Sequence, residues 1–262
     1  MFRLLVVALF SCLVPLAHAE PLQVTFGGEY FSWREYDQNR RLLEETGPRY
    51  FVSLKTGQPT QGSWRYDLAG RVYLGQADYD GHTQVGTPYA TDTDYLGWAA
   101  ELGVTRMLGV TDNLSGWGIR LGLGYDAWRR RVQDGYDLLG KRTYGHDEDY
   151  RIGYGRLGAV YGLGDGWQLQ GGLKLPFYAH EHAELSRLSY DGDTTLKPKP
   201  DYSLYASLSY RLNGRWDVGG YYDSYRFRES GQRTVNRAGN PYSVYQPKSQ
   251  QDTLGFYLNY RF

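Results

Sequence analysis

The sequence predicts an all-β fold, a ten-stranded antiparallel up-and-down transmembrane β-barrel, and three observations support this prediction. Apolar and polar side chains alternate in successive segments, long and short connections alternate between these segments, and a tryptophan follows each short connection. Only every second residue of a barrel strand must face lipid, so the other residues can be polar. A barrel therefore accommodates a chain with a mean hydropathy of −0.60, 34 glycines and 26 tyrosines.

The alternation is clearest in the last segment, from Asp252 to Phe262. Its large apolar face consists of Leu254, Phe256, Leu258, Tyr260 and Phe262. A period of two residues is that of a β-strand. A closing strand that ends on phenylalanine resembles the last strand of Gram-negative outer-membrane β-barrels. The resemblance implies location in the cell outer membrane, with Phe262 as an assembly signal read by the outer-membrane barrel assembly machinery.

The first residues predict a secretory signal peptide at 1–19, followed by one barrel domain at 20–262. A basic start at Arg3 precedes a short apolar run and the sequence Ala17-His18-Ala19. The run is shorter than the roughly 20 residues of a membrane-spanning helix. The single cysteine, Cys12, falls within the signal peptide, so the mature chain can form no disulfide. Removing the signal leaves 28 bases and 29 acids, which implies no nucleic-acid partner.

Nine further strands are expected before the closing one. We place them at 22–36, 49–55, 64–74, 96–104, 117–126, 150–162, 167–177, 204–212 and 216–223. The long links are 37–48, 78–93, 133–149, 186–200 and 229–251, and the short links are 57–63, 109–116, 164–166 and 213–215. This order predicts short periplasmic turns and long extracellular loops. A soluble β-sandwich is the alternative fold, but it gives no reason for such sorting.

The sixth strand alternates less regularly than the others. Ile152 and Tyr154 are out of phase with Leu157. Either Gly153 or Gly155 marks a bulge, or the Tyr154 side chain points into the barrel.

Four tryptophans occupy the first outward position after a short turn. They are Trp64, Trp117, Trp167 and Trp216. In a barrel they would form a girdle at the inner membrane interface, where amphipathic rings are favoured.

The polar faces of the predicted strands bring charges of both signs into the lumen. The acids are Glu29, Asp67, Glu101, Asp126, Asp217 and Asp223, and the bases are Lys55, Arg71, Arg120, Arg156, Lys174, Arg211 and Arg261. Side chains nearly fill a barrel of about eight to ten strands. Charges removed from water need partners, so we expect a salt-bridged lumen that is closed or leaks only small solutes.

These features predict a non-enzymatic outer-membrane barrel, either a porin-like channel of low conductance or a structural or surface-interaction protein. We expect a monomer in contact with outer-membrane lipid and lipopolysaccharide, without cofactor or metal. An adhesin whose long loops bind a ligand is a further possibility.

The alternative is a surface hydrolase. Asp78 and Asp80 follow the third strand, and His180 and His182 follow the seventh. In strand number and in these Asp and His residues near the rim, the chain resembles the omptins, outer-membrane proteases that activate water with Asp and His. The resemblance implies proteolysis by those four residues.

Overall fold

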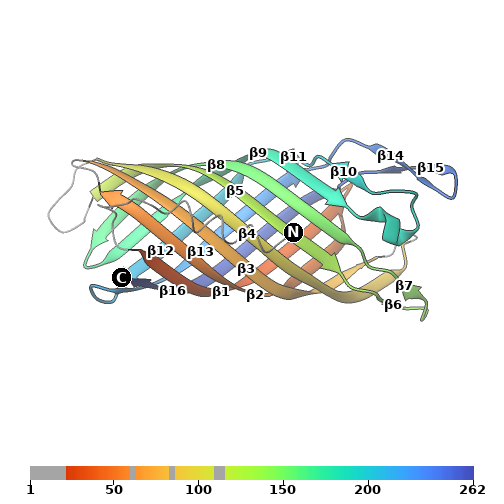
Figure 1. Ribbon diagram of the computed structural model, residues 1–262, viewed down its shortest axis with the longest axis horizontal. Coiled ribbons are helices and arrows are strands. Elements are labelled where there is room, and N and C mark those ends of the chain that lie inside the picture. The colour runs from red at the N-terminus through yellow and green to blue at the C-terminus, as the bar shows by residue number, and fades with distance from the viewer. Residues whose placement is uncertain (1–21, 60–62, 83–85, 109–115) are drawn as a thin grey trace.

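The computed structural model describes residues 22–59, 63–82, 86–108 and 116–262 (Figure 1). The predicted signal peptide at 1–19 lies outside these residues. Ten long strands of 9 to 21 residues build the barrel. They are β1 (Gln23–Asp37), β2 (Arg40–Pro59), β3 (Trp64–His82), β4 (Pro88–Leu108), β5 (Gly116–Val132), β8 (Asp147–Gly164), β9 (Trp167–Ala183), β12 (Ser203–Arg211), β13 (Trp216–Arg228) and β16 (Lys248–Arg261).

The sheet closes on itself, because each long strand pairs antiparallel with its neighbours in the sequence and β1 pairs with β16. The β1–β16 register runs from Gln23 opposite Arg261 to Tyr36 opposite Lys248. The backbone N–H of Phe262 donates a hydrogen bond to the carbonyl oxygen of Leu22, at 3.0 Å. The predicted up-and-down barrel is therefore confirmed, and the soluble sandwich is excluded.

Large apolar side chains cover the outside of the barrel. We call these outward residues the apolar belt. On the extracellular side the belt reaches Tyr30 on β1, Tyr50 on β2, Leu96 on β4, Tyr125 on β5 and Tyr178 on β9. An outward apolar band with a polar interior is the surface that a lipid bilayer requires of a barrel.

The strands continue well beyond the apolar belt. The predicted long link at 37–48 is mostly strand, because β2 starts at Arg40 and only Gln38 and Asn39, both with positive φ (46° and 68°), make the turn. Likewise, β3 and β4 extend into the predicted link at 78–93. Beyond the belt the outward residues of β3 and β4 are mostly polar, whereas inward residues such as Ala77, Tyr79 and Tyr89 are buried, so the hydropathy of the two faces is reversed relative to the belt.

Short elements lie at the extracellular end of the barrel, opposite the C-terminus (Figure 1). They are β6 (Gly135–Asp137), β7 (Arg142–Thr143), the 3₁₀ helix η1 (Leu185–Leu188), β10 (Thr194–Leu196), β11 (Lys199–Pro200), β14 (Arg233–Arg237) and β15 (Asn240–Val244). The last two form a separate hairpin. In the described part of the chain, no helix is long and apolar enough to cross a membrane.

The irregular sixth barrel strand, β8, turns its tyrosine inward. Tyr154 is only 4% exposed, and the register between β8 and β9 shifts next to it. Gly153 pairs with Tyr178 while Tyr154 pairs with Pro176, which leaves Phe177 as an extra residue on β9. The bulge is therefore on β9. The alternation of β8 is unbroken, and Ile152 and Tyr154 both point into the lumen.

Inward tyrosine rings lie directly over glycines of the neighbouring strand. A Cβ atom at Gly97 would lie 2.4 Å from the Tyr73 ring, and one at Gly124 would lie 2.3 Å from the Tyr154 ring. Such contacts are closer than carbon atoms can approach. These glycines therefore provide the space in which large rings lie flat against the barrel wall.

Candidate functional site: a divided lumen

Aromatic side chains fill the outer half of the lumen. This aromatic plug consists of Phe31, Trp33, Tyr95, Trp128, Tyr150, Tyr225 and Phe227, all between 0% and 4% exposed. Trp128 stacks on Tyr150 with ring centroids 4.9 Å apart and planes at 9°. Every second residue of these strands still points into the lumen above the apolar belt. At this height the inward residues are aromatic, so their rings fill the interior.

The plug spans the barrel from wall to wall. Trp33 on β1 contacts Trp128 on β5, with ring centroids 6.4 Å apart. The shorter way round the wall between these strands passes β2, β3 and β4. A contact between such distant strands crosses the lumen at this height.

Below the plug the lumen holds a polar cavity of about 880 Å³, which we call the periplasmic chamber. Arg49 and Tyr73 line its upper part, near the plug. Lys55, Arg65 and Arg211 line its lower part, next to the periplasmic ends of β2, β3 and β12. The chamber thus lies on the periplasmic side of the plug.

Ion pairs cross-link one side of the chamber. Glu29 accepts from Arg49, with an Nη2–Oε1 distance of 2.7 Å, and from Arg71. Asp67 accepts a bidentate contact from Arg120, one arm of which measures 2.8 Å. Planar guanidinium groups suit such paired contacts with carboxylates.

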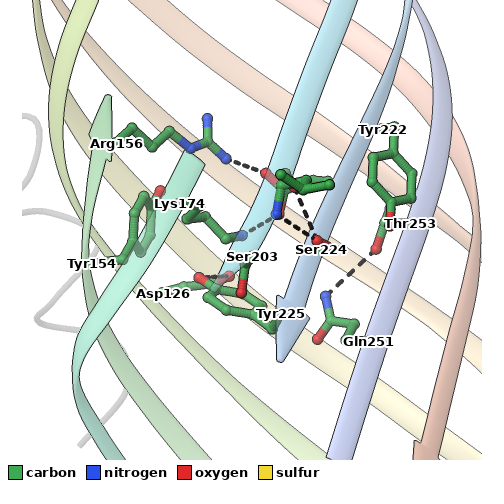
Figure 2. A network of polar contacts seen from close by, with 12 residues as sticks. Asp126, Tyr154, Arg156, Lys174, Ser203, Tyr222, Ser224, Tyr225, Gln251 and Thr253 are labelled. Carbon is green, nitrogen blue, oxygen red and sulfur yellow. Dashed lines mark hydrogen bonds and ion pairs between the residues drawn. The ribbon is translucent and has the colours of Figure 1, made fainter. Parts of the chain in front are cut away.

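A second set of contacts joins the other strands. Arg156 bridges Glu101, at 3.0 Å, and Asp223, which also binds Lys174. Figure 2 shows Arg156 and Lys174 extending from β8 and β9 toward β13. These contacts tie β4, β8, β9 and β13 together across the lumen.

Two carboxylates complete the set assigned to the lumen by the sequence. Asp126 accepts hydrogen bonds from the hydroxyl groups of Tyr73, at 2.8 Å, and Tyr225, at 3.2 Å. Asp217 accepts from Arg261, at 2.5 Å, and lies 3.7 Å from Arg211. All thirteen charged residues assigned to the lumen by the sequence line the chamber or pair within it. They are Glu29, Lys55, Asp67, Arg71, Glu101, Arg120, Asp126, Arg156, Lys174, Arg211, Asp217, Asp223 and Arg261.

A second charged group, whose members sequence reasoning did not bring together, lies on the extracellular side of the barrel. This outer carboxylate cluster consists of Glu35, Glu45, Glu148 and Glu181 around Arg130, all at most 6% exposed. Arg130 donates to Glu45 at 2.6 Å and to Glu148 at 2.5 Å. Glu45 and Glu148 fall in segments predicted as loops. Their inward alternation at the strand ends was the signal that could have found them.

The cluster lies beyond the apolar belt, and its carboxyl groups differ in pKa. Burial, together with the nearby Glu148 and Glu35, raises the pKa of Glu181 well above its usual value. Burial also acts on Glu148, but Arg130 and the adjacent His146 outweigh it and lower the pKa of Glu148. One guanidinium lies among four buried carboxyl groups, and this shortage of compensating charge favours the neutral form of the least compensated of them.

The four residues of the hydrolase alternative do not meet. Asp78 and Asp80 point outward from β3, whereas His180 and His182 point outward from β9. Their inward neighbours, Ala77, Tyr79, Ala179 and Glu181, are the buried residues of these strand ends. On the shorter way round the wall, β4, β5 and β8 separate the two strands.

The structure therefore does not bring the two pairs together in one site, because strand alternation places both pairs on the outer wall. Within the described ranges, no three His, Cys, Asp or Glu side chains are arranged to hold a metal ion.

The four tryptophans of the expected girdle each stand at or near the periplasmic start of a strand. Trp64, Trp117 and Trp167 are 41%, 56% and 43% exposed. Trp117 stacks on Tyr161, at 4.3 Å, and Trp216 lies 4.7 Å from Tyr260. The expected assembly signal, Phe262, is 70% exposed at the same end. The membrane-interface and assembly roles stay predictions.

The closed strand pairing and the apolar belt define an outer-membrane β-barrel protein. No protein-family model and no curated protein matches the sequence. In structure, the chain is similar to the outer membrane protease OmpT from Escherichia coli, with a TM-score of 0.58 and 14% identity over 93% of this chain and 96% of that chain. This likeness shows a shared fold.

Two other solved structures are more distantly similar. The β domain of the Bordetella autotransporter BrkA has a TM-score of 0.44 and 14% identity, over 91% of this chain and 99% of that chain. An outer membrane channel from Pseudomonas putida F1 has a TM-score of 0.44 and 9% identity, over 95% of this chain and 99% of that chain.

Proposed function

We propose that this protein is a non-enzymatic outer-membrane barrel with a closed lumen, acting as a structural and surface-interaction protein and not as an open pore. The contact between Trp33 and Trp128 across the lumen carries this proposal. Both rings are at most 4% exposed, so water does not pass between them. The sequence predicts either a porin-like channel of low conductance or a structural or surface-interaction protein, and the plug favours the structural or surface-interaction role.

The extracellular elements supply the surface for interaction. In the β6–β7 hairpin, Leu138 and Leu139 are 79% and 82% exposed and Tyr136 is 68% exposed. Tyr202 and Tyr242 add further exposed rings at this end of the barrel. Adjacent exposed apolar side chains of this kind typically mark a site of contact with another molecule.

Current through planar lipid bilayers tests the closed lumen. We expect almost no current from the wild-type protein and a measurable increase from the double variant Trp33→Ala, Trp128→Ala, because removing both rings opens the plug. The matched control is Trp98→Ala, a tryptophan on the outer wall of β4 that is 43% exposed. A large and steady wild-type current would overturn the proposal.

The hydrolase alternative has a direct assay. Intact cells that carry the protein would be incubated with cationic peptides, and we expect no cleavage, because Asp78 and His180 point outward from strands that β4, β5 and β8 separate. Cleavage that disappears in the His180→Ala variant would contradict the non-enzymatic proposal.

A further inference from the structure

The aromatic plug separates charge of opposite sign along the barrel. Among the described residues, nine basic side chains line the periplasmic chamber, whereas six acids line it or pair with them there, an excess of three positive charges. The outer carboxylate cluster contains four acids and one arginine. The sequence suggested a balanced mixture, but it missed Arg49 and Arg65, which add to the positive side of the chamber.

The excess is concentrated at the periplasmic mouth. Its two carboxylates are already engaged by buried or half-buried arginines, Asp67 by Arg120 at 2.8 Å and Asp217 by Arg261 at 2.5 Å. Lys55 and Arg211 are farther away, at 3.8 Å from Asp67 and 3.7 Å from Asp217.

The mouth thus presents two cations whose carboxylate partners are each shared with a closer arginine. Lys55 and Arg211 have side chains that are 44% and 40% exposed, so a solute can reach them. Arg65 lines the same cavity from β3, and no ion pair joins it to the described part of the chain. Three cations around one opening attract an anion more strongly than any of them alone.

We propose that the periplasmic chamber binds a small polyanion, a compound with two or more phosphate or carboxylate groups, through Lys55, Arg65 and Arg211. The cavity volume of about 880 Å³ lies within the range of small-molecule sites. Uncharged donors and acceptors, among them Gln168, Gln170 and Asn259, line it as well. This inference rests on the proposed closure of the plug for one point: the polyanion enters and leaves by the periplasmic mouth and does not pass through the barrel.

The spacing of the cations favours several negative groups over one. Lys55 is on β2 and Arg65 on β3, whereas Arg211 is on β12, with β1, β16 and β13 between β2 and β12. A single small anion reaches either the Lys55 and Arg65 side of the mouth or the Arg211 side. A polyanion contacts two parts at once, and the second contact forms at a high effective concentration.

Isothermal titration calorimetry of the purified full barrel in detergent tests the proposal, with citrate and pyrophosphate as separate probes. We expect saturable binding of at least one probe, with citrate testing carboxylates and pyrophosphate testing phosphates. Binding should weaken as ionic strength rises, because exposed charges are screened. A triple variant, Lys55→Gln, Arg65→Gln, Arg211→Gln, should bind about 100-fold more weakly, from roughly five-fold per lost charge.

The matched control removes the same charge elsewhere. Arg40, Arg228 and Arg233 are exposed at the extracellular end, and the triple variant with Gln at these positions should bind as the wild type does. Retained heat-modifiable mobility on gels would show that both variants fold. Failure of both probes to bind the wild type, or equal binding by the two triple variants, would overturn the proposal. Neither result depends on the conductance of the plug.

Discussion

Replacing Arg130 with methionine should destabilise the barrel strongly at neutral pH. Arg130 is 2% exposed and donates to Glu45 at 2.6 Å and to Glu148 at 2.5 Å. Methionine fills much of the same volume but leaves the carboxylates without their cation. Removing one partner of a buried ion pair typically costs about 3–5 kcal/mol, because the remaining charge stays buried and uncompensated.

The neighbouring residue provides a control on the same strand. Arg129 points outward, its side chain is 44% exposed, and it pairs with Asp149 at 2.7 Å. A surface pair contributes about 0–1 kcal/mol, so Arg129→Met should change stability little.

Urea unfolding of both variants in lipid vesicles, followed by tryptophan fluorescence, would measure the difference in the free energy of unfolding. The Arg130→Met cost should shrink as the pH falls below the usual carboxyl range, because protonated carboxyl groups need no cation. Equal costs for the two variants, or a cost independent of pH, would refute the reasoning about the cluster.

Three other predictions follow from the same structure. Burial raises the folded-state pKa of Glu181, so its contribution to stability is present below the unfolded pKa of 4.5 and is lost as the pH rises through the folded value. Relative to the wild type, the Glu181→Gln variant should therefore gain stability as the pH rises above 4.5 in urea unfolding at several pH values; an unchanged pH profile would contradict this. Gly97→Val should cost about 1–3 kcal/mol by overpacking against the Tyr73 ring, and Tyr73→Ala should recover part of that cost in a double-mutant cycle; strictly additive costs would show that the two residues do not interact. Deleting Phe262, whose exposed ring contacts Tyr260, should reduce the amount of assembled barrel in cells without changing refolding in detergent, as heat-modifiable mobility would report; equal losses in both settings would point to a structural role.

The sequence predicts the part of the fold that lies against lipid. Between Leu121 and Tyr125, for example, apolar outward residues alternate with glycines, and lipid on one side makes that alternation visible. Above the belt the rule changes, because water surrounds the barrel and the core is inside. Around Glu45 both faces of the strand carry polar residues. Alternation in the sequence therefore does not reveal that the Glu45 side chain is fully buried.

Strand alternation predicts which charged side chains point into the lumen, but it does not predict which of them form ion pairs. Alternation placed Arg120 and Asp67 inside, but their bidentate contact depends on the stagger between β3 and β5, which alternation does not set. The plug was harder to foresee. Phe31 and Trp33 continue the inward phase of β1, and a rule that expects polar residues inside a barrel misassigns them.

The hydrogen bond between Phe262 and Leu22 brings the two ends of the described chain together on the periplasmic side. The barrel is thus a ring of antiparallel hairpins with one seam, and only non-covalent pairing holds that seam shut. A circular permutant could relocate the break, for instance to the two-residue turn at Gln38 and Asn39, while every strand kept both neighbours. The position of the chain ends matters for synthesis and export, whereas the architecture of the barrel depends on the cyclic order of its hairpins.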